Sequence, residues 1–399
     1  MRQIAYKSSF EENVAMGHGP IWLLAIANGA GHMRTASSIA SALRAHGDLN
    51  LRIIEISSYM SAIARFTHVT AYLWLLRYAP TLWDRIDRYQ KQRPRTSPAW
   101  YYRLNCRQLF ELARSVRPQA MVATEVGCCE IAALIKRDLA LDCPIVAVNT
   151  CYDADRAWVQ PEVDLYGVMT ESLREAYIAN GAPASSVVAW GLPLAPEFKS
   201  MPARAEARKA VCQRFELTPE LPLLLIAGGG EGLNLAEMLD QAIRHVPRAQ
   251  LIVLAGRCAR LKEKCEKLAA KAKARVRVLG WTDEMPLLMR AADLAVSKLG
   301  NFFDEALVAE LPIVAPLPPP GAERAQHSLL ELWGVGCAAK TAREAATIAA
   351  RLLADPMRLE RMRRACRAHK REGAADRIAA WIIEAITKRR IGAMFRHDA

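Results

Sequence analysis

Two successive series of short apolar runs, separated by stretches of helical spacing, constrain the fold of this chain more than any other feature. Continuous apolar runs of this length are typical of strands in a parallel sheet that helices cover on both faces. Their alternation with helices predicts right-handed crossovers and an α/β protein with two doubly wound, Rossmann-like sheets. The predicted strands are residues 20–27, 51–56, 120–124, 144–149, 165–169 and 186–190, and then 222–227, 250–255, 276–279, 292–296 and 311–316.

The length of 399 residues is large for one hydrophobic core and suits two domains. We expect an N-terminal domain over residues 1–200 and a C-terminal domain over residues 201–374, which begins with a helix at 204–216. A last helix at 375–388 opens the segment 375–399, which ends in a basic tail, and we expect this helix to pack back across the hinge. Sheets of this kind bind ligands at the carboxyl ends of their strands, so we expect the two domains to face a cleft.

The first strand leads into a glycine turn and then a helix, through Asn28-Gly29-Ala30-Gly31-His32. Main-chain N–H groups at such a helix start, together with the helix dipole, make an anion site. His32 at its mouth can accept a proton near neutral pH and is our candidate general base. The alternative is a tight turn whose histidine is merely exposed.

The second series begins in the same way, with Gly228-Gly229-Gly230-Glu231-Gly232 after the strand 222–227. Two such turns at one cleft could hold a diphosphate. A dinucleotide-dependent dehydrogenase is the competing interpretation. However, the first turn lacks the third glycine of G-x-G-x-x-G, and Glu55 is the only candidate for the acid that binds the ribose.

The formal net charge of +13 predicts an anionic partner, such as nucleic acid, anionic lipid or a phosphorylated ligand. No nucleic-acid-binding motif is visible, so we expect no nucleic acid partner. The ten cysteines show no C-x-x-C spacing, which indicates reduced thiols and no cysteine metal site. No apolar run approaches the ~20 residues of a spanning helix, and no secretory signal is apparent. We therefore expect a cytoplasmic protein, in solution or on a membrane surface.

Residues 57–103 interrupt the α/β alternation and combine aromatic side chains with a first group of cations. Trp and Tyr beside Arg suit a membrane interface, where rings lie at headgroup level and cations meet anionic lipid. The alternative is an amphipathic helical pair packed on the sheet, with arginine stems covering apolar surface. Two further basic groups, at 262–277 and 358–371, are interpreted as solvated helix faces. The first group comprises Arg85, Arg88, Lys91, Arg93, Arg95, Arg103 and Arg107, among the aromatic residues Phe66, Tyr72, Trp74, Tyr78, Trp83, Tyr89, Trp100, Tyr101 and Tyr102.

Several motifs, separated but in the right order, give the chain a specific resemblance. The stretch from Val276 through Gly280-Trp281-Thr282-Asp283 to Ser297-Lys298-Leu299-Gly300 resembles the nucleotide-sugar domain of glycosyltransferase family 28. Within that family it is most similar to the monogalactosyldiacylglycerol synthase and processive diacylglycerol glucosyltransferase group. The resemblance spans about residues 20–340. It continues through Gly29-Ala30-Gly31-His32, Trp158 to Asp164, Gly191-Leu192-Pro193-Leu194, Gly228 to Gly232, Glu305 to Pro312, and Pro320 to Gln326.

The resemblance implies a GT-B enzyme that transfers a hexose from a UDP-sugar to a lipid hydroxyl with inversion, with no cofactor and no essential metal. The N-terminal domain would then be the acceptor side, with His32 as the base and Gly29, Gly31, Cys151 and Asp155 nearby. We expect a peripheral enzyme on the cytoplasmic face of the membrane, bound to an anionic lipid surface.

The same resemblance assigns donor-binding roles to residues of the C-terminal domain. Main-chain N–H groups and a lysine can stabilise the departing diphosphate, a carboxylate can accept from both ribose hydroxyls, and a strand end can hold uracil. For each residue the alternative is an ordinary structural or surface position. The assigned residues are Gly229, Gly230, Glu231 and Lys298 for the diphosphate loop, Trp281 for uracil, Glu305 for the ribose, and Glu323 and Gln326 for the sugar hydroxyls.

The chain also departs from the family pattern. Thr150-Cys151 stands where Thr-Asp is usual, and Asp155-Arg156 stands where His-Pro is usual, which leaves the acceptor open. Four residues rather than five separate Gly300 from Glu305, and Ala322 replaces a residue that reads a sugar hydroxyl, which leaves the sugar open. A related enzyme with a soluble acceptor, and a non-catalytic or NAD-binding protein, remain as alternatives.

Overall fold

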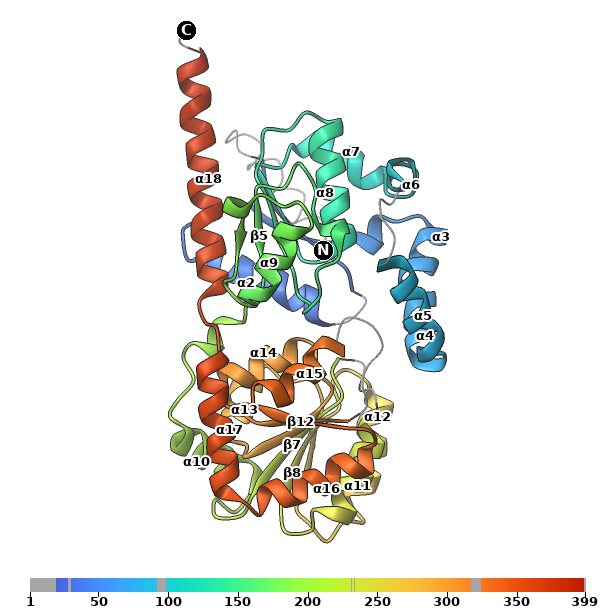
Figure 1. Cartoon of the computed structure of the whole chain (residues 1–399), viewed down its shortest axis with the longest axis vertical. Helices are drawn as coiled ribbons and strands as arrows, with labels where there is room; N and C mark the ends of the chain where they lie inside the picture. Colours follow the sequence, from blue (N-terminus) through green and yellow to red (C-terminus); the bar gives the residue numbers. More distant parts are fainter. Residues whose placement is uncertain are drawn as a thin grey trace, which may run out of the picture. The chain divides into compact units, whose positions relative to one another are not determined.

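A computed structural model describes residues 19–27, 30–91, 98–230, 232, 234–316 and 324–397 of the chain (Figure 1). The chain divides into two compact units. The first unit takes the residues up to Ala195 and those from Gly373 onward, and the second takes Pro196–Glu372. The chain therefore leaves the first unit once and returns to it for its last helix.

The first unit is built on a parallel six-stranded sheet with the order β2-β1-β3-β4-β5-β6. The first strand is fully buried, as its continuous apolar sequence requires in a sheet covered on both faces. The order reverses between β1 and β3, because β2 pairs with one edge of β1 and β3 with the other. The strands are β1 (Ile21–Ala25), β2 (Leu51–Glu55), β3 (Ala120–Ala123), β4 (Ile145–Val148), β5 (Leu165–Gly167) and β6 (Val187–Val188).

Helices connect these strands, and the longest connection lies between β2 and β3. The helices of the first unit are α2 (Ala30–Arg44), α3 (Ala62–Arg65), α4 (Ala71–Tyr78), α5 (Pro80–Lys91), α6 (Ala99–Asn105), α7 (Arg107–Val116), α8 (Val126–Asp138), α9 (Glu171–Ala179) and α18 (Ala374–His397). Short 3-10 turns are η1 (Ile56–Tyr59), η3 (Arg156–Trp158) and η4 (Ala184–Ser186), and η2 (Phe66–Thr70) is a π-helical turn between α3 and α4.

Helix α18 completes the core of the first sheet. In the sequence, the whole second unit separates this helix from the rest of the first unit. Its buried residues Ile378, Ala379 and Ile382 pack in one cluster with β1 and with the apolar face of α2. The two helices lie side by side in Figure 1. The helix is longer than the predicted 375–388, and Arg389 near its exposed end binds Asp164 and Asp142 of the same unit.

The second unit is also a parallel six-stranded sheet, with the order β12-β11-β10-β7-β8-β9. In chain order this is the arrangement of a dinucleotide-binding Rossmann fold, whose reversal lies between the first and fourth strands, here β7 and β10. The strands are β7 (Leu223–Ala227), β8 (Gln250–Leu254), β9 (Val276–Leu279), β10 (Leu294–Ser297), β11 (Ile313–Pro316) and β12 (Gly336–Ala339).

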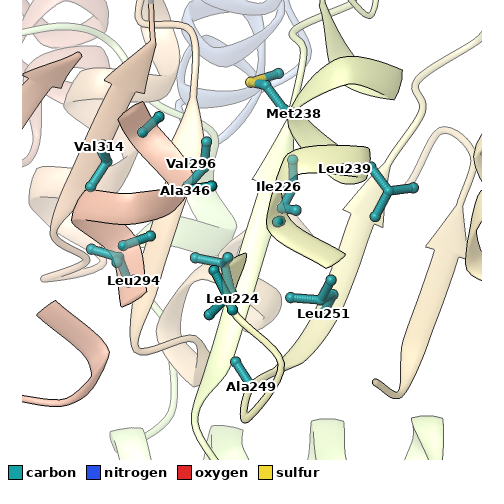
Figure 2. Close-up of a cluster of buried hydrophobic side chains, with 14 of the residues drawn as sticks. Leu224, Ile226, Met238, Leu239, Ala249, Leu251, Leu294, Val296, Val314 and Ala346 are labelled. Carbon is teal, nitrogen blue, oxygen red and sulfur yellow. The ribbon is translucent and has the colours of Figure 1, made fainter. Parts of the chain in front are cut away.

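The helices of the second unit cover this sheet, and α11 and α16 lie together on one face. Buried residues of α11 recur at helical spacing, from Leu235 through Met238 and Leu239 to Ala242. Figure 2 shows Met238 and Leu239 beside Leu224 and Ile226 of β7 in this core. The elements are η5 (Pro196–Phe198), α10 (Arg204–Phe215), α11 (Leu235–His245), α12 (Ala259–Ala269), α13 (Met285–Ala291), α14 (Asn301–Val308), α15 (Arg324–Leu332), α16 (Ala342–Leu353) and α17 (Pro356–His369).

The predicted fold class is confirmed, since two parallel sheets with interleaved helices are present. The interpretation of the third basic group as a solvated helix face is wrong in part. Arg363 of α17 is mostly buried and, with Arg204 and Arg208 of α10, binds the single carboxylate of Asp293. Burial, together with the charge of Arg363, lowers the pKa of Arg204 to about 10. The second group fits the interpretation better, because Lys262 and Lys267 form i,i+4 pairs along exposed α12.

Candidate active site

The carboxyl edge of the first sheet carries the predicted base. His32 lies in the first turn of α2, directly after β1, and Thr124 directly follows β3, the neighbouring strand across the reversal of strand order. Ligand sites of open α/β sheets form at this position, because adjacent loops leave it in opposite directions. The topology therefore places His32 where a site is expected.

Two oxygen atoms lie beside one nitrogen of the His32 ring. The ring nitrogen Nδ1 lies 2.7 Å from the main-chain oxygen of Thr124 and 3.1 Å from the hydroxyl of Thr150, which follows β4. The Thr150 hydroxyl in turn lies 3.4 Å from the same Thr124 oxygen. Thr124 and Thr150 are buried, whereas His32 is half-buried.

This geometry decides which ring nitrogen carries the proton of the neutral imidazole. A carbonyl oxygen only accepts hydrogen bonds, so at 2.7 Å the Nδ1 atom must carry the proton and donate it to Thr124. The opposite nitrogen, Nε2, then holds the lone pair and makes no hydrogen bond within the described part of the chain. A half-buried imidazole with this tautomer can accept a proton from a ligand.

Thr124 and Thr150 are the site residues that sequence reasoning missed as partners of the base. They are separated from His32 by 92 and 118 residues, so no local pattern connects them to it. Thr124 ends the predicted strand 120–124, and Thr150 directly follows the predicted strand 144–149. The rule that ligands bind at carboxyl ends of strands was therefore the available signal.

The two predicted acceptor-side residues of the loop after β4 have clear structural surroundings. The Cys151 N–H donates to Asn149 Oδ1 at 2.7 Å, and its sulfur lies 4.0 Å from the Thr150 hydroxyl. Asp155 caps η3 by accepting from the N–H of Ala157 at 2.9 Å. Cys151 is thus a neighbour of the His32 network, while Asp155 shapes the turn that follows it. Gly31 lies beside His32 in the first turn of α2, and Gly29 lies outside the described residues.

Glu55, the candidate ribose acid of the dehydrogenase interpretation, is engaged by its own loop. Its carboxylate accepts from the N–H of Ala27 at 3.1 Å and from the N–H and hydroxyl groups of Ser57 and Ser58. Burial raises the pKa of Glu55, but these hydrogen bonds outweigh it, and the pKa lies below its usual value. Glu55 therefore holds the turn after β2, and the dehydrogenase interpretation loses its acid.

The carboxyl edge of the second sheet is built mainly from glycines. Strand pairing places Ala227, Leu254, Leu279 and Ser297 in one row, so the residues that follow them emerge side by side. Gly229 has a φ of 71°, and a Cβ atom there would lie 2.4 Å from Cε of Lys298. The stem of Lys298 thus crosses directly over the glycine turn, at the reversal of strand order. The topology brings together two of the residues assigned to the diphosphate.

Trp281 lies on the same edge, after β9, beside a residue that the sequence did not single out. The guanidinium carbon of Arg257, which follows β8, lies 3.8 Å from the centroid of the exposed Trp281 ring. An arginine over an indole face is a favourable cation–π arrangement. Gly256, which precedes Arg257, approaches the glycine turn after β7 closely, because a Cβ atom there would lie 3.0 Å from the main-chain oxygen of Gly230. Arg257 therefore stabilises the position of the ring assigned to uracil.

Helix α14 begins on this edge and carries Glu305, which is buried. Gly300 precedes the helix with a φ of 75°, and Gln326 of α15 binds both main-chain groups of that glycine. Gln326 accepts from the Gly300 N–H at 2.8 Å and donates to its carbonyl at 3.1 Å. Gln326, expected to read sugar hydroxyls, thus also fixes the loop before Glu305. Glu231 and Glu323 lie outside the described residues.

Within the described residues, no three His, Cys, Asp or Glu side chains gather as a metal site would need. Within the same residues, no helix has the length and apolar character needed to cross a membrane.

Two parallel α/β sheets with sites at their carboxyl edges define the two-domain GT-B class, which solved structures support. MurG of Acinetobacter baumannii superposes with a TM-score of 0.58 at 16% identity, over 92% of this chain and 99% of that one. MnaA of S. aureus, solved with UDP, gives 0.59 at 14% identity, over 90% and 94%. HepE of Anabaena, in complex with UDP and glucose, gives 0.51 at 14% identity, over 96% and 100%. These likenesses establish the fold.

The sequence comparisons then identify the group within this class. Residues 32–194 match the family model described as monogalactosyldiacylglycerol (MGDG) synthase. A processive diacylglycerol beta-glucosyltransferase of Bacillus mycoides is 24% identical, over 89% of this chain and 91% of the relative. One of Staphylococcus haemolyticus is 24% identical, over 84% of each chain. The resemblance to this glycosyltransferase group is confirmed.

Proposed function

We propose that this enzyme transfers a hexose from a UDP-sugar to the hydroxyl of a membrane lipid, with inversion at the anomeric carbon. The observation that carries the proposal is the His32 imidazole, held by the Thr124 carbonyl with its Nε2 lone pair available. The names of the sequence relatives support the lipid acceptor and the diacylglycerol-like substrate class. Cys151 and Asp155 depart from the family pattern on the acceptor side. The acceptor lipid, for example a diacylglycerol or a polyprenyl lipid, is therefore to be identified by assay.

In this mechanism the acceptor oxygen attacks the anomeric carbon as its proton moves to Nε2 of His32, and the bond to the diphosphate breaks. The leaving UDP gains negative charge, which the main-chain N–H groups of Gly229 and Gly230 and the ammonium of Lys298 would stabilise. Glu305 would accept from the ribose hydroxyls, and Trp281 would hold the uracil. Because the protein supplies these charges itself, we expect transfer to persist in the presence of EDTA.

The connection between β2 and β3 supports docking on a membrane. Of the thirteen exposed large hydrophobic side chains among the described residues, eight lie between residues 63 and 104. Soluble proteins rarely gather exposed apolar side chains in this way unless they bind a partner or a membrane. We therefore propose that this segment docks on anionic lipid at the cytoplasmic face. The eight are Ile63, Phe66, Trp74, Tyr78, Leu82, Tyr89, Trp100 and Leu104.

Some members of the predicted docking segment have other roles. Tyr102 is buried and donates to Glu130 of α8 at 2.7 Å, so it fixes α6 to the domain. Arg103 binds Asp138 through two nitrogens, and Arg107 binds Glu111. Arg93 and Arg95 lie outside the described residues. We assign docking to the exposed rings and to the remaining cations of the group.

The proposed function can be tested first for the sugar donor and then for the lipid acceptor. A thermal-shift panel of UDP-sugars should show one preferred UDP-hexose, and that donor should label a lipid in a membrane extract. Labelling only of water-soluble products would instead favour a soluble acceptor, and the absence of any UDP effect on unfolding would contradict the donor class.

Membrane docking has its own experiment. Phe66→Ser with Trp74→Ser should reduce co-sedimentation with phosphatidylglycerol vesicles, and Leu332→Ser with Met357→Ser, exposed positions of the second unit, should not. Changing Arg85, Arg88, Arg93 and Arg95 to Gln should remove the salt-sensitive part of binding, about 1 kcal/mol for each cation near the surface. UDP binding should survive every change. If neither set of substitutions changes vesicle binding, the segment packs within the protein and does not dock on lipid.

A further inference from the structure

The His32 base is oriented by neutral oxygens. In many enzymes that use a histidine base, a carboxylate binds the second ring nitrogen. Here the groups within hydrogen-bond distance of Nδ1 are the Thr124 carbonyl and the Thr150 hydroxyl, and no carboxylate of the described residues bonds to this ring.

Thr124 contacts His32 at two separate points. Its main-chain oxygen accepts from the ring, and its side-chain hydroxyl lies 3.2 Å from the His32 main-chain oxygen and 3.2 Å from that of Leu24. One buried residue therefore fixes both the backbone of the first turn of α2 and the rotation of the imidazole. Thr150 closes a triangle of short contacts with these atoms.

We propose that Thr124 and Thr150 are the positioning residues of the base, and that they hold the imidazole in the Nδ1–H tautomer. The inference rests on the proposed function of His32. In water, histidine favours the Nε2–H form, which would turn a proton rather than a lone pair toward the acceptor. The Thr124 carbonyl selects the productive form, and the Thr150 hydroxyl, 3.1 Å from Nδ1, disfavours the flipped ring, which would place a C–H group where Nδ1 meets these two oxygens.

The kinetic test uses a change that keeps shape and removes only the hydroxyl. Thr150→Val should lower kcat by about 3- to 10-fold, the worth of one hydrogen bond, with little change in KM for the UDP-sugar. Thr150→Ser should restore most of kcat. Thr170→Val is the matched control, because that hydroxyl caps α9 in the same unit and does not touch His32, so it should cost stability only.

The direct test is spectroscopic and does not depend on activity. In ¹⁵N-histidine-labelled protein at neutral pH, the His32 signals, assigned by loss in His32→Gln, should show a protonated Nδ1 and a bare Nε2. Thr150→Val should move the ring toward a mixture of tautomers, whereas Thr124→Val keeps the main-chain oxygen that accepts from Nδ1 and should change the tautomer less. An Nε2–H ring in the unmodified protein would overturn the proposal.

The role of His32 as the base and the positioning role of the two threonines can be disproved separately. If His32→Ala retains turnover, the base assignment fails, while the tautomer measurement still decides the positioning. If His32→Ala loses turnover but Thr150→Val keeps both the kcat and the tautomer of the unmodified enzyme, the base stands and the positioning role of Thr150 is overturned.

Discussion

The carboxyl edges of the two sheets occupy the same place in the topology but are built from opposite materials. In the first unit, His32 lies between buried threonines that contact its Nδ1 atom and its main-chain oxygen. In the second unit, Gly229 and Gly256 lack side chains where Lys298 and a neighbouring loop approach the main chain closely. In the proposed mechanism the first edge must orient a base and the second must let phosphate approach the main chain, and the composition of each edge suits that difference.

The largest expected effect concerns the first edge. His32→Ala should reduce turnover by ~10²–10⁴-fold, the usual contribution of general acid–base catalysis, and leave UDP affinity nearly unchanged. Initial rates of lipid glycosylation and calorimetric titration with UDP measure the two quantities. Near-normal turnover would show that His32 is not the base. The need to orient a base would then no longer explain why the two edges differ in composition.

Glu305→Ala is the corresponding test at the second edge. Glu305→Ala should weaken UDP binding by roughly 1.5–3 kcal/mol, the range for hydrogen bonds to a charged group. The loop between Gly300 and Glu305 is one residue shorter than usual, so the neighbouring Asp304 is the comparison variant. If calorimetry shows that Asp304→Ala weakens UDP binding and Glu305→Ala does not, the ribose contact belongs to Asp304.

Gly229 tests whether the glycine edge works through close approach. Gly229→Ala adds a methyl group against Lys298 at a positive φ, and it should weaken UDP binding by about 1–2 kcal/mol. Gly334→Ala is the control, since its φ of 67° is similar but its nearest neighbour is a methyl group 3.9 Å away. Both variants should unfold earlier in urea. Only Gly229→Ala should lose UDP affinity, and equal loss in both would reduce the effect to backbone strain.

The smallest effect concerns Glu55 and depends on pH. Its folded-state pKa lies below the usual 4.5, so its charge stabilises the fold above that pH, and the contribution is lost as the pH falls through the folded pKa. Glu55→Gln should therefore cost about 1 kcal/mol at pH 7 and much less in acid, once the pH is below the folded-state pKa. Urea unfolding at both pH values measures it, and a constant difference would assign the loss to packing.

Much of the fold could be predicted because it depends on local patterns. The runs 20–27 and 222–227 coincide with β1 and β7, and the helix expected at 204–216 is α10. Strand β12 was missed because Gly336-Cys337-Ala338-Ala339 lacks the branched apolar residues that mark a strand, and it forms only by pairing with β11.

The site could be predicted as single residues but not as contacts. His32 and Gly229 were found because each lies at a glycine turn after a strand, and Lys298 was found through the resemblance to the family. The grip of Thr124 on His32 and the binding of Gly300 by Gln326 join distant segments, and the side chain of Arg257 could have turned in several directions. Such pairings depend on the folded arrangement, and no spacing along the sequence encodes them.

The return of the chain to its first unit has a consequence for synthesis. The core around β1 lacks Ile378, Ala379 and Ile382 until residues beyond the whole second unit have been made. During translation the second unit can therefore complete its own core before the first, although domains usually fold in order from the N-terminus. A ribosome stalled just after the second unit would carry that unit folded, with its proposed UDP site, behind an unfinished first one. Because α18 packs against α2, which carries His32, the proposed base would gain this support only once the last helix has been synthesised.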